Sequence, residues 1–229
     1  MRDHVEFLRQ FRDRFKTTGA VAPSSRFLAA AMTRPFAERS RPARVLEIGP
    51  GTGAVTRHIV NQMGPQDRLD LVELNETFAA NLARKLEEEP GFRAVAERTN
   101  LHQCRLEDFR DDAPYEFIIS GLPLNNFAAD SVSDIFDTYF RLLAPGGVLS
   151  YFEYMYVRPL RRLVARGPER HRLTQLDQVM QPYVSKRRFR RNWVFANVPP
   201  AWVQHLKQSE ATDNQPIIAT ELIDRGPAA

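Results

Sequence analysis

The sequence of 229 residues contains a single cysteine, no long apolar run and no cluster of metal ligands. Cys104 alone cannot form an internal disulfide, and a structural zinc site would lack its usual ligands. No stretch approaches the roughly 20 apolar residues that span a bilayer, and no apolar segment follows the first residues as in a signal peptide. The histidines are scattered, so no metal site is expected. These absences favour a cytoplasmic protein.

Charge is distributed unevenly along the chain. Residues 1–44 carry ten Lys and Arg against four Asp and Glu, residues 45–155 carry nine against eighteen, and residues 156–207 carry twelve against two. Basic segments commonly bind phosphates, either on nucleic acid or on lipid head groups. Solvated arginines on helix faces would give the same counts, so charge alone leaves both interpretations open.

Residues 44–155 alternate short apolar runs with segments of helical periodicity. Strands are expected over residues 44–49, 69–74, 101–106, 116–120 and 148–154, and helices over 55–63, 76–89 and 132–143. Strands separated by helical crossovers of this length build a doubly wound parallel sheet. The sequence therefore predicts an α/β fold with a mostly parallel, Rossmann-like sheet.

The flanking segments are less regular. Apolar spacing predicts amphipathic helices near both residues 5–15 and residues 27–32. Downstream, helices are expected over 160–164, 173–183 and 202–206, and a strand over 189–198. We thus divide the chain into a helical segment over 1–43 that covers the substrate or lies on a membrane, a main domain over 44–207 and a tail over 208–229.

A glycine-rich turn stands where the first expected strand passes into a helix. It reads Glu47-Ile48-Gly49-Pro50-Gly51-Thr52-Gly53. Glycine allows the backbone to turn tightly and to approach a ligand, and the helix that follows offers free N–H groups. The G-x-G-x-G spacing differs from the G-x-G-x-x-G of dinucleotide sites.

Two carboxylates decide which ligand this turn suits. Glu47 precedes the first glycine by two residues, where it can receive the ammonium of an amino-acid ligand. Glu73 ends the next expected strand, where a carboxylate can accept both ribose hydroxyls. Together they favour S-adenosylmethionine over NAD as the cofactor.

These residues resemble the class I methyltransferase family over residues 44–155. Two segments narrow the resemblance: Gly19-Ala20-Val21-Ala22-Pro23-Ser24-Ser25 is similar to the GAIAPSS segment of bacterial phospholipid N-methyltransferases, and Asn197-Val198-Pro199-Pro200-Ala201 to their NxPPA segment. The resemblance extends over about residues 5–207. It implies a sheet of the seven-stranded type and methyl transfer from S-adenosylmethionine to phosphatidylethanolamine and its methylated intermediates, towards phosphatidylcholine.

The resemblance also implies which residues hold the cofactor. They are Glu47, Gly49, Gly51, Gly53, Glu73, Leu74, Leu106, Glu107, Ser120, Gly121 and Leu122. The chain departs from the family at the end of the third strand, where an acidic residue commonly meets the adenine amino group. Here that stretch reads Cys104-Arg105-Leu106-Glu107-Asp108, so Glu107 or Asp108 would have to take this role.

A lipid amine is largely protonated at neutral pH and must lose a proton before it accepts a methyl group. The candidates that hold or deprotonate it are Ser120, at the end of the fourth strand, and the aromatic run that contains Tyr151 and Glu153. An aromatic face can also hold a methylated cation, although plain strand packing explains such a run equally well. The lipid phosphate would pair with Arg158, Arg162 and Arg188.

The expected partner is a phospholipid membrane surface with anionic lipids, and the expected location is peripheral, on the inner face of the cell membrane. The main alternative is an RNA adenine N6-methyltransferase, which shares the core and needs basic flanks. Leu124, in place of a base-stacking aromatic, speaks against nucleic acid. A second alternative is a non-catalytic binding module, against which the intact glycine turn speaks.

Overall fold

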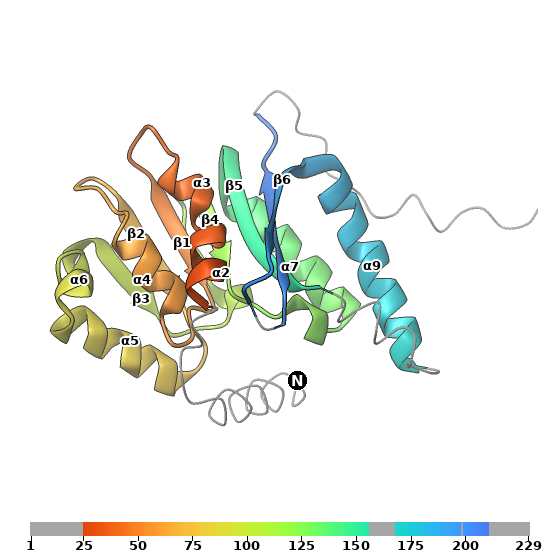
Figure 1. The fold of residues 1–229 in the computed structure, drawn as a ribbon, viewed down its shortest axis with the longest axis horizontal. Helices are drawn as coiled ribbons and strands as arrows, with labels where there is room; N and C mark the ends of the chain where they lie inside the picture. Colours follow the sequence, from red (N-terminus) through yellow and green to blue (C-terminus); the bar gives the residue numbers. More distant parts are fainter. Residues whose placement is uncertain (1–24, 156–167, 198, 211–229) are drawn as a thin grey trace, which may run out of the picture.

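The structure is a computed structural model that describes residues 25–155, 168–197 and 199–210. Its centre is a seven-stranded sheet with the strand order β3-β2-β1-β4-β5-β7-β6 (Figure 1). The strands are β1 (Arg44–Ile48), β2 (Arg68–Val72), β3 (Thr99–His102), β4 (Tyr115–Ser120), β5 (Leu143–Tyr154), β6 (Arg188–Val194) and β7 (Ala201–Lys207). The helices are α2 (Ser25–Met32), α3 (Arg34–Ala37), α4 (Ala54–Val60), α5 (Glu76–Glu88), α6 (Pro90–Arg93), α7 (Ala129–Leu142) and α9 (Pro168–Arg187), with 3-10 turns η1 (Ala96–Arg98), η2 (Leu106–Asp108) and η3 (Leu124–Asn126).

Strand pairing confirms the predicted mostly parallel, Rossmann-like sheet. β1 pairs in parallel with β2 and with β4, and β4 pairs in parallel with β5. β7 is antiparallel to both of its neighbours, β5 and β6, and so runs opposite to the other strands. The carboxyl ends of all the other strands therefore lie along one edge of the sheet.

Both faces of the sheet are covered, which explains why β1 is apolar along most of its length. On one face, Leu46 and Ile48 pack with residues of α7 and α9 in one buried cluster. On the other face, Val45 belongs to a second cluster that includes Met32 of α2 and Phe36 of α3. The two clusters hold β1 rigidly at the centre, and the segment that follows β1 starts from a fixed position.

Several predicted elements differ from the structure: β5 begins at Leu143 rather than 148, β6 ends at Val194 rather than 198, and two further differences have a clear cause. Residues 202–206 are predicted to be helical because Trp202 and Leu206 are four residues apart, but they lie in strand β7. Val203 and Leu206 are both fully buried there, since β5 and β6 flank the strand and helices cover both faces. The third strand is also shorter and earlier than predicted, because residues from Cys104 onward leave the sheet towards η2.

The helix predicted near residues 27–32 corresponds to α2, and the one over 173–183 lies within α9. The helices expected over 5–15 and 160–164 lie outside the described residues. Within the described ranges, none of the helices is both long enough and apolar enough to cross a bilayer. The same ranges contain no group of three or more His, Cys, Asp or Glu side chains placed to hold a metal ion.

Candidate functional site

The glycine turn connects β1 to α4 through three residues with left-handed backbone. Gly49, Gly51 and Gly53 have φ angles of 66°, 56° and 80°, a region that strains other residues. The amide of Gly49 donates to the carbonyl of Val72 at 2.9 Å, which ties the turn to the end of β2. The chain therefore reverses within a few residues and leaves backbone at the carboxyl edge of the sheet.

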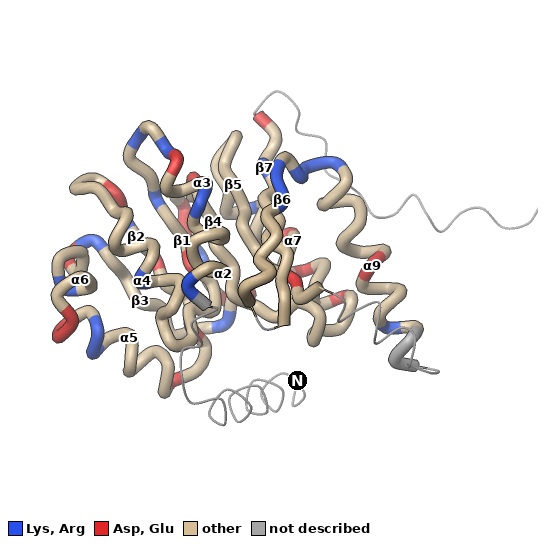
Figure 2. Tube along the Cα trace, viewed as in Figure 1, with Lys and Arg blue, Asp and Glu red and all other residues tan. Residues whose placement is uncertain are grey.

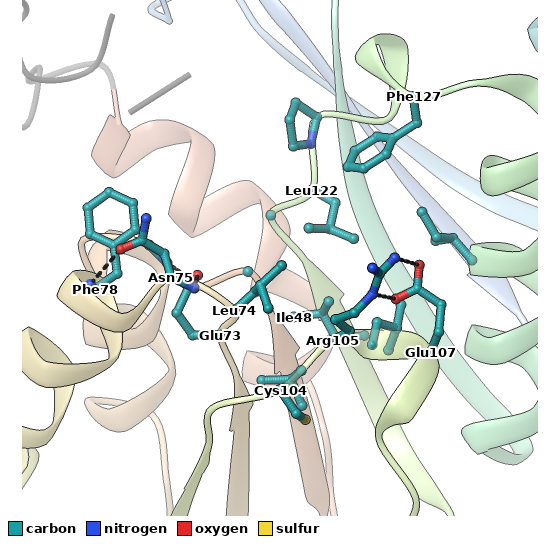
Figure 3. Close-up of a pocket in the computed structure, with 17 residues that line it drawn as sticks. Ile48, Glu73, Leu74, Asn75, Phe78, Cys104, Arg105, Glu107, Leu122 and Phe127 are labelled. Atoms are coloured by element: carbon teal, nitrogen blue, oxygen red, sulfur yellow. Dashed lines mark hydrogen bonds and ion pairs between the residues drawn. The ribbon is translucent and has the colours of Figure 1, made fainter. Parts of the chain in front are cut away.

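A pocket opens beside this turn at the ends of β1, β2 and β4 (Figure 3). The predicted residues that line it are Gly49, Gly51, Glu73, Leu74, Leu106, Glu107, Gly121 and Leu122. Glu47, Gly53 and Ser120 are not among its lining residues. The lining residues that were not predicted are Ile48, Val72, Asn75, Phe78, Cys104, Arg105, Pro123, Phe127 and Ile135. Asn75 could have been found, because its side chain caps α5 directly after Glu73 and Leu74.

Glu73 is fixed in the wall of the pocket by backbone donors. One carboxylate oxygen accepts the amide of Gly51 at 2.9 Å, and the other accepts the amide of Asn75 at 2.8 Å. Burial raises the pKa of Glu73, while these hydrogen bonds act in the opposite direction. Each carboxylate oxygen has a further acceptor position. The side chain can thus accept a further donor without leaving its place.

Glu47 is a buried carboxyl on β1 with an incomplete set of partners. Its side chain is 1% exposed, and its Oε2 atom has no hydrogen-bond partner in the described part of the chain. Burial raises the pKa of Glu47 to about 8, and the nearby charge of Glu73 adds to the rise. The carboxyl is therefore mostly protonated at neutral pH unless a cation approaches it.

The far wall of the pocket comes from the segments that follow β3 and β4. Leu122 and Phe127 provide apolar surface, and the side chain of Leu106 is buried. Arg105 donates to both carboxylate oxygens of Glu107 at 3.4 and 3.5 Å (Figure 3). Glu107 thus stands at the predicted place but is engaged by a neighbouring arginine, and Asp108 does not line the pocket.

The three residues predicted to act on the substrate do not line this pocket. Ser120 is fully buried, and its Oγ lies 2.6 Å from the hydroxyl of Tyr139 on α7. Tyr151 is also fully buried, with its ring packed edge-on against Phe136 at 5.5 Å. Glu153 lines a separate groove between α9 and the strands β6 and β7. The register places Ser120 beside Tyr151, whereas Glu153 lies beyond the end of β4.

The predicted phosphate-binding arginines fall in two places. Arg188 lines the same groove as Glu153, together with Asp177 of α9. Arg158 and Arg162 lie outside the described residues.

Residues 45–147 match the family described as "Methyltransferase domain". This segment contains the glycine turn, Glu73 and the whole wall of the pocket. Residues 45–147 therefore form a methyltransferase domain.

Three known proteins are similar to this chain over different parts of its length. Ornithine lipid N-methyltransferase from Singulisphaera acidiphila is 29% identical over 167 residues, which cover 71% of this chain and 85% of that protein. The tRNA1(Val) (adenine(37)-N6)-methyltransferase from Yersinia pestis is 34% identical over 82 residues, 35% of this chain and 32% of that protein. The structure of 1,6-didemethyltoxoflavin-N1-methyltransferase from Burkholderia thailandensis, with S-adenosylhomocysteine bound, superposes with a TM-score of 0.63 at 16% identity over 90% of this chain and 87% of that chain. This last likeness shows the common fold.

The residues in and next to this pocket fit S-adenosylmethionine on three observations. A Cβ atom added at Gly51 would meet nothing within 4 Å, so open space lies directly above the turn. The buried Oε2 atom of Glu47 lacks a donor, as expected of a carboxyl that awaits a cationic group. The carboxylate of Glu73 is held in place by two backbone amides, so it can accept hydrogen bonds from the ribose of an adenosyl amino acid.

No side chain fits at Gly121, which follows β4 and lies directly against the glycine turn. A Cβ atom there would lie 2.6 Å from the carbonyl oxygen of Gly49. We expect Gly121→Ala to destabilise the fold by about 1–3 kcal/mol, because backbone would have to move. Gly91→Ala in α6 is the matched control, since its Cβ would come no closer than 3.4 Å to Asn61. Chemical denaturation measures both, and equal stability of the two variants would contradict this packing.

Proposed function

We propose that the methyltransferase transfers methyl groups from S-adenosylmethionine to the amine of phosphatidylethanolamine and its methylated intermediates, towards phosphatidylcholine at the membrane surface. The main support is the similarity to an ornithine lipid N-methyltransferase, which extends over 71% of this chain and 85% of that protein. That relative is named for an amine-bearing lipid. The excess of basic residues over 156–207 also suits a phosphate-bearing substrate.

The proposed cofactor contacts follow the pocket. The Glu73 carboxylate would accept the two ribose hydroxyls, with the hydrogen bonds from Gly51 and Asn75 holding it in place. The carboxyl of Glu47 would face the ammonium group. Leu74, Leu106 and Leu122 would hold the adenine ring between apolar surfaces, with Glu107 at its edge. Gly49, Gly53 and Gly121 would act through their backbone, by allowing the close approach.

S-adenosylmethionine supplies a methyl group that is activated by the positive sulfur. The protein must then place a neutral amine in line with the methyl–sulfur bond and exclude water. The segment Gly121–Pro123 forms the pocket wall after β4, so the amine would arrive beside it. The hydroxyl of Ser120 is already hydrogen-bonded to Tyr139, which leaves its carbonyl as the group proposed to hold the amine.

Tyr151, which pairs with Ser120, and Glu153, two residues farther along β5, remain proposed contributors. Tyr151 would support the strand end from within the core, and Glu153 would attract the protonated amine as it enters. Arg158, Arg162 and Arg188 are proposed to bind the lipid phosphate. We also propose the division of the chain at residues 43/44 and 207/208, and a peripheral location on the inner face of the cell membrane.

Labelled S-adenosylmethionine tests this proposal in three parallel reactions. The full chain is incubated with vesicles of phosphatidylethanolamine, with vesicles of ornithine lipid, and with tRNA, and the products are separated by chromatography. Label in methylated phosphatidylethanolamine is expected. Label in ornithine lipid alone would move the substrate to another lipid amine, and label in tRNA alone would establish the nucleic-acid alternative. No transfer by a chain that binds the cofactor would indicate a non-catalytic module.

A further inference from the structure

The edge strand β6 and the residue that follows it carry aromatic side chains on an open surface. Phe189, Trp193 and Phe195 are 48%, 53% and 65% exposed, and they make up most of the large apolar side chains exposed in the described ranges. Trp193 stacks on Phe195 with ring centres 5.7 Å apart, and its edge meets Trp202 of β7 at 5.7 Å. Exposed aromatic side chains that cluster, as these do, often mark an interaction surface.

The position of this pair relates it to the cofactor pocket. Trp193 lies near the carboxyl end of β6, and Phe195 directly follows the strand. Because β5 and β6 both run antiparallel to β7, β6 has the same direction as β1, and their carboxyl ends share one edge of the sheet (Figure 1). The aromatic pair and the pocket therefore lie at the same edge of the sheet.

Positive charge accompanies the aromatic pair. Arg191 precedes Trp193 by two residues, on the same face of β6, and Arg188 lines the groove beside it. Within the described residues, neither arginine forms an ion pair, whereas Arg190 on the opposite face pairs with Glu38. Figure 2 shows the basic residues gathered where α9 passes into β6.

We propose that Trp193, Phe195, Arg188 and Arg191 form a docking surface for an anionic lipid bilayer. This proposal rests on the proposed lipid substrate, and it names the surface that would bring the pocket to the membrane. Tryptophan partitions into the membrane interface, and arginines close to an anionic leaflet are attracted to its phosphates. A base-stacking platform is less favoured, because Trp193 already uses one ring face against Phe195.

Tryptophan fluorescence tests the contact directly, since the chain has two tryptophans. A Trp202→Phe variant keeps Trp193 as the single reporter. With vesicles that contain phosphatidylglycerol and brominated acyl chains, we expect a blue shift and strong quenching of its emission. Vesicles without anionic lipid should produce much less of this effect. Vesicle sedimentation without any quenching would overturn the proposed surface.

Two variants separate the aromatic and the charged contributions. Trp193→Ala with Phe195→Ala is expected to weaken vesicle binding about tenfold or more. Arg188→Gln with Arg191→Gln should weaken it and reduce its salt dependence, whereas the control Arg84→Gln with Arg93→Gln, on α5 and α6, should not. Circular dichroism confirms that each variant is folded. Unchanged vesicle binding, or loss of self-association in its place, would contradict the proposal.

A failure of the proposed docking surface can be distinguished from a failure of the proposed function. Methylation of a short-chain lipid amine below its micelle concentration does not need a surface, so the aromatic variant should retain it. Retained methylation with unchanged vesicle binding would reject the surface and keep the function. Normal vesicle binding without methylation of any lipid would reject the function and keep the surface, and tight tRNA binding through the same residues would reject both.

Discussion

Replacing Glu73 with alanine is expected to lower the affinity for S-adenosylmethionine about a hundredfold or more. A hydrogen bond to a charged group contributes about 1.5–3 kcal/mol, and the carboxylate is proposed to accept two from the ribose. Each 1.4 kcal/mol corresponds to about a tenfold change in binding. The variant also removes the acceptor of the Gly51 and Asn75 amides, which loosens the turn itself.

Calorimetry on three variants distinguishes these contributions. Glu73→Gln keeps the shape and one acceptor oxygen, so its affinity should lie between those of the wild type and Glu73→Ala. Glu76→Gln, on an exposed position in the first turn of α5, should bind as the wild type does. If folded Glu73→Ala bound the cofactor normally, the ribose would have to lie elsewhere.

The parts of this site that are local in sequence could be predicted from it. The turn between β1 and α4 is predictable because its glycines, the preceding apolar strand and the following helix are contiguous, and the observed β1 differs from the prediction by one residue. Glu73 is predictable for the same reason, as the first polar residue after a buried strand end. In both cases the place in the element is set within a few residues, although the hydrogen bond from Gly51 to Glu73 joins two segments of the chain.

The remaining parts depend on contacts between distant residues. Strand β7 exists because β5 and β6 supply its hydrogen-bond partners on both sides, and its own sequence also fits a helix. The hydroxyl of Ser120 is engaged by Tyr139, and Arg172 of α9 donates to the carbonyl oxygens of Asn125 and Phe127. These contacts shape the part of the pocket wall that follows β4, and no local sequence pattern predicts them.

Arg172 also shows how α9 reaches the cofactor pocket without lining it. The carbonyl of Phe127 accepts from its guanidinium at 2.9 Å, while Phe127 itself lines the pocket. The segment after β4 is thus held between the sheet and α9. A methyl acceptor that enters beside Gly121–Pro123 would meet a wall whose position is fixed from behind.

The unfolding free energy of the cofactor-free protein is expected to fall as the pH rises from about 6.5 to 8. Burial raises the pKa of Glu47 to about 8 in the folded protein, against 4.5 for a solvated glutamate, so the folded state retains a proton that the unfolded state has lost. Stability from this group is complete below pH 4.5 and is lost as the pH approaches 8. The slope is about 1.4 kcal/mol per pH unit for one proton, or roughly 2 kcal/mol over this window.

A second buried group, His205, has the opposite sign but titrates below this window. Burial lowers the pKa of His205 to about 4, so its contribution to stability is lost as the pH falls from 6.5 to 4. Above pH 6.5 that contribution is constant. Denaturation of Glu47→Gln at pH 6.5 and pH 8 should show most of the slope removed, whereas Glu88→Gln, exposed on α5, should keep it. An equal slope in Glu47→Gln and the wild type would assign the effect to other groups.

The same carboxyl should couple cofactor binding to proton release. A cationic ammonium placed against Glu47 favours its charged form, so a group that is mostly protonated in the free protein ionises on binding. Near pH 7, the calorimetric enthalpy of binding should therefore depend on the ionisation enthalpy of the buffer, with close to one proton released. Glu47→Gln should bind more weakly and release none. Binding enthalpies that are the same in phosphate and Tris would show that Glu47 does not meet the ammonium group.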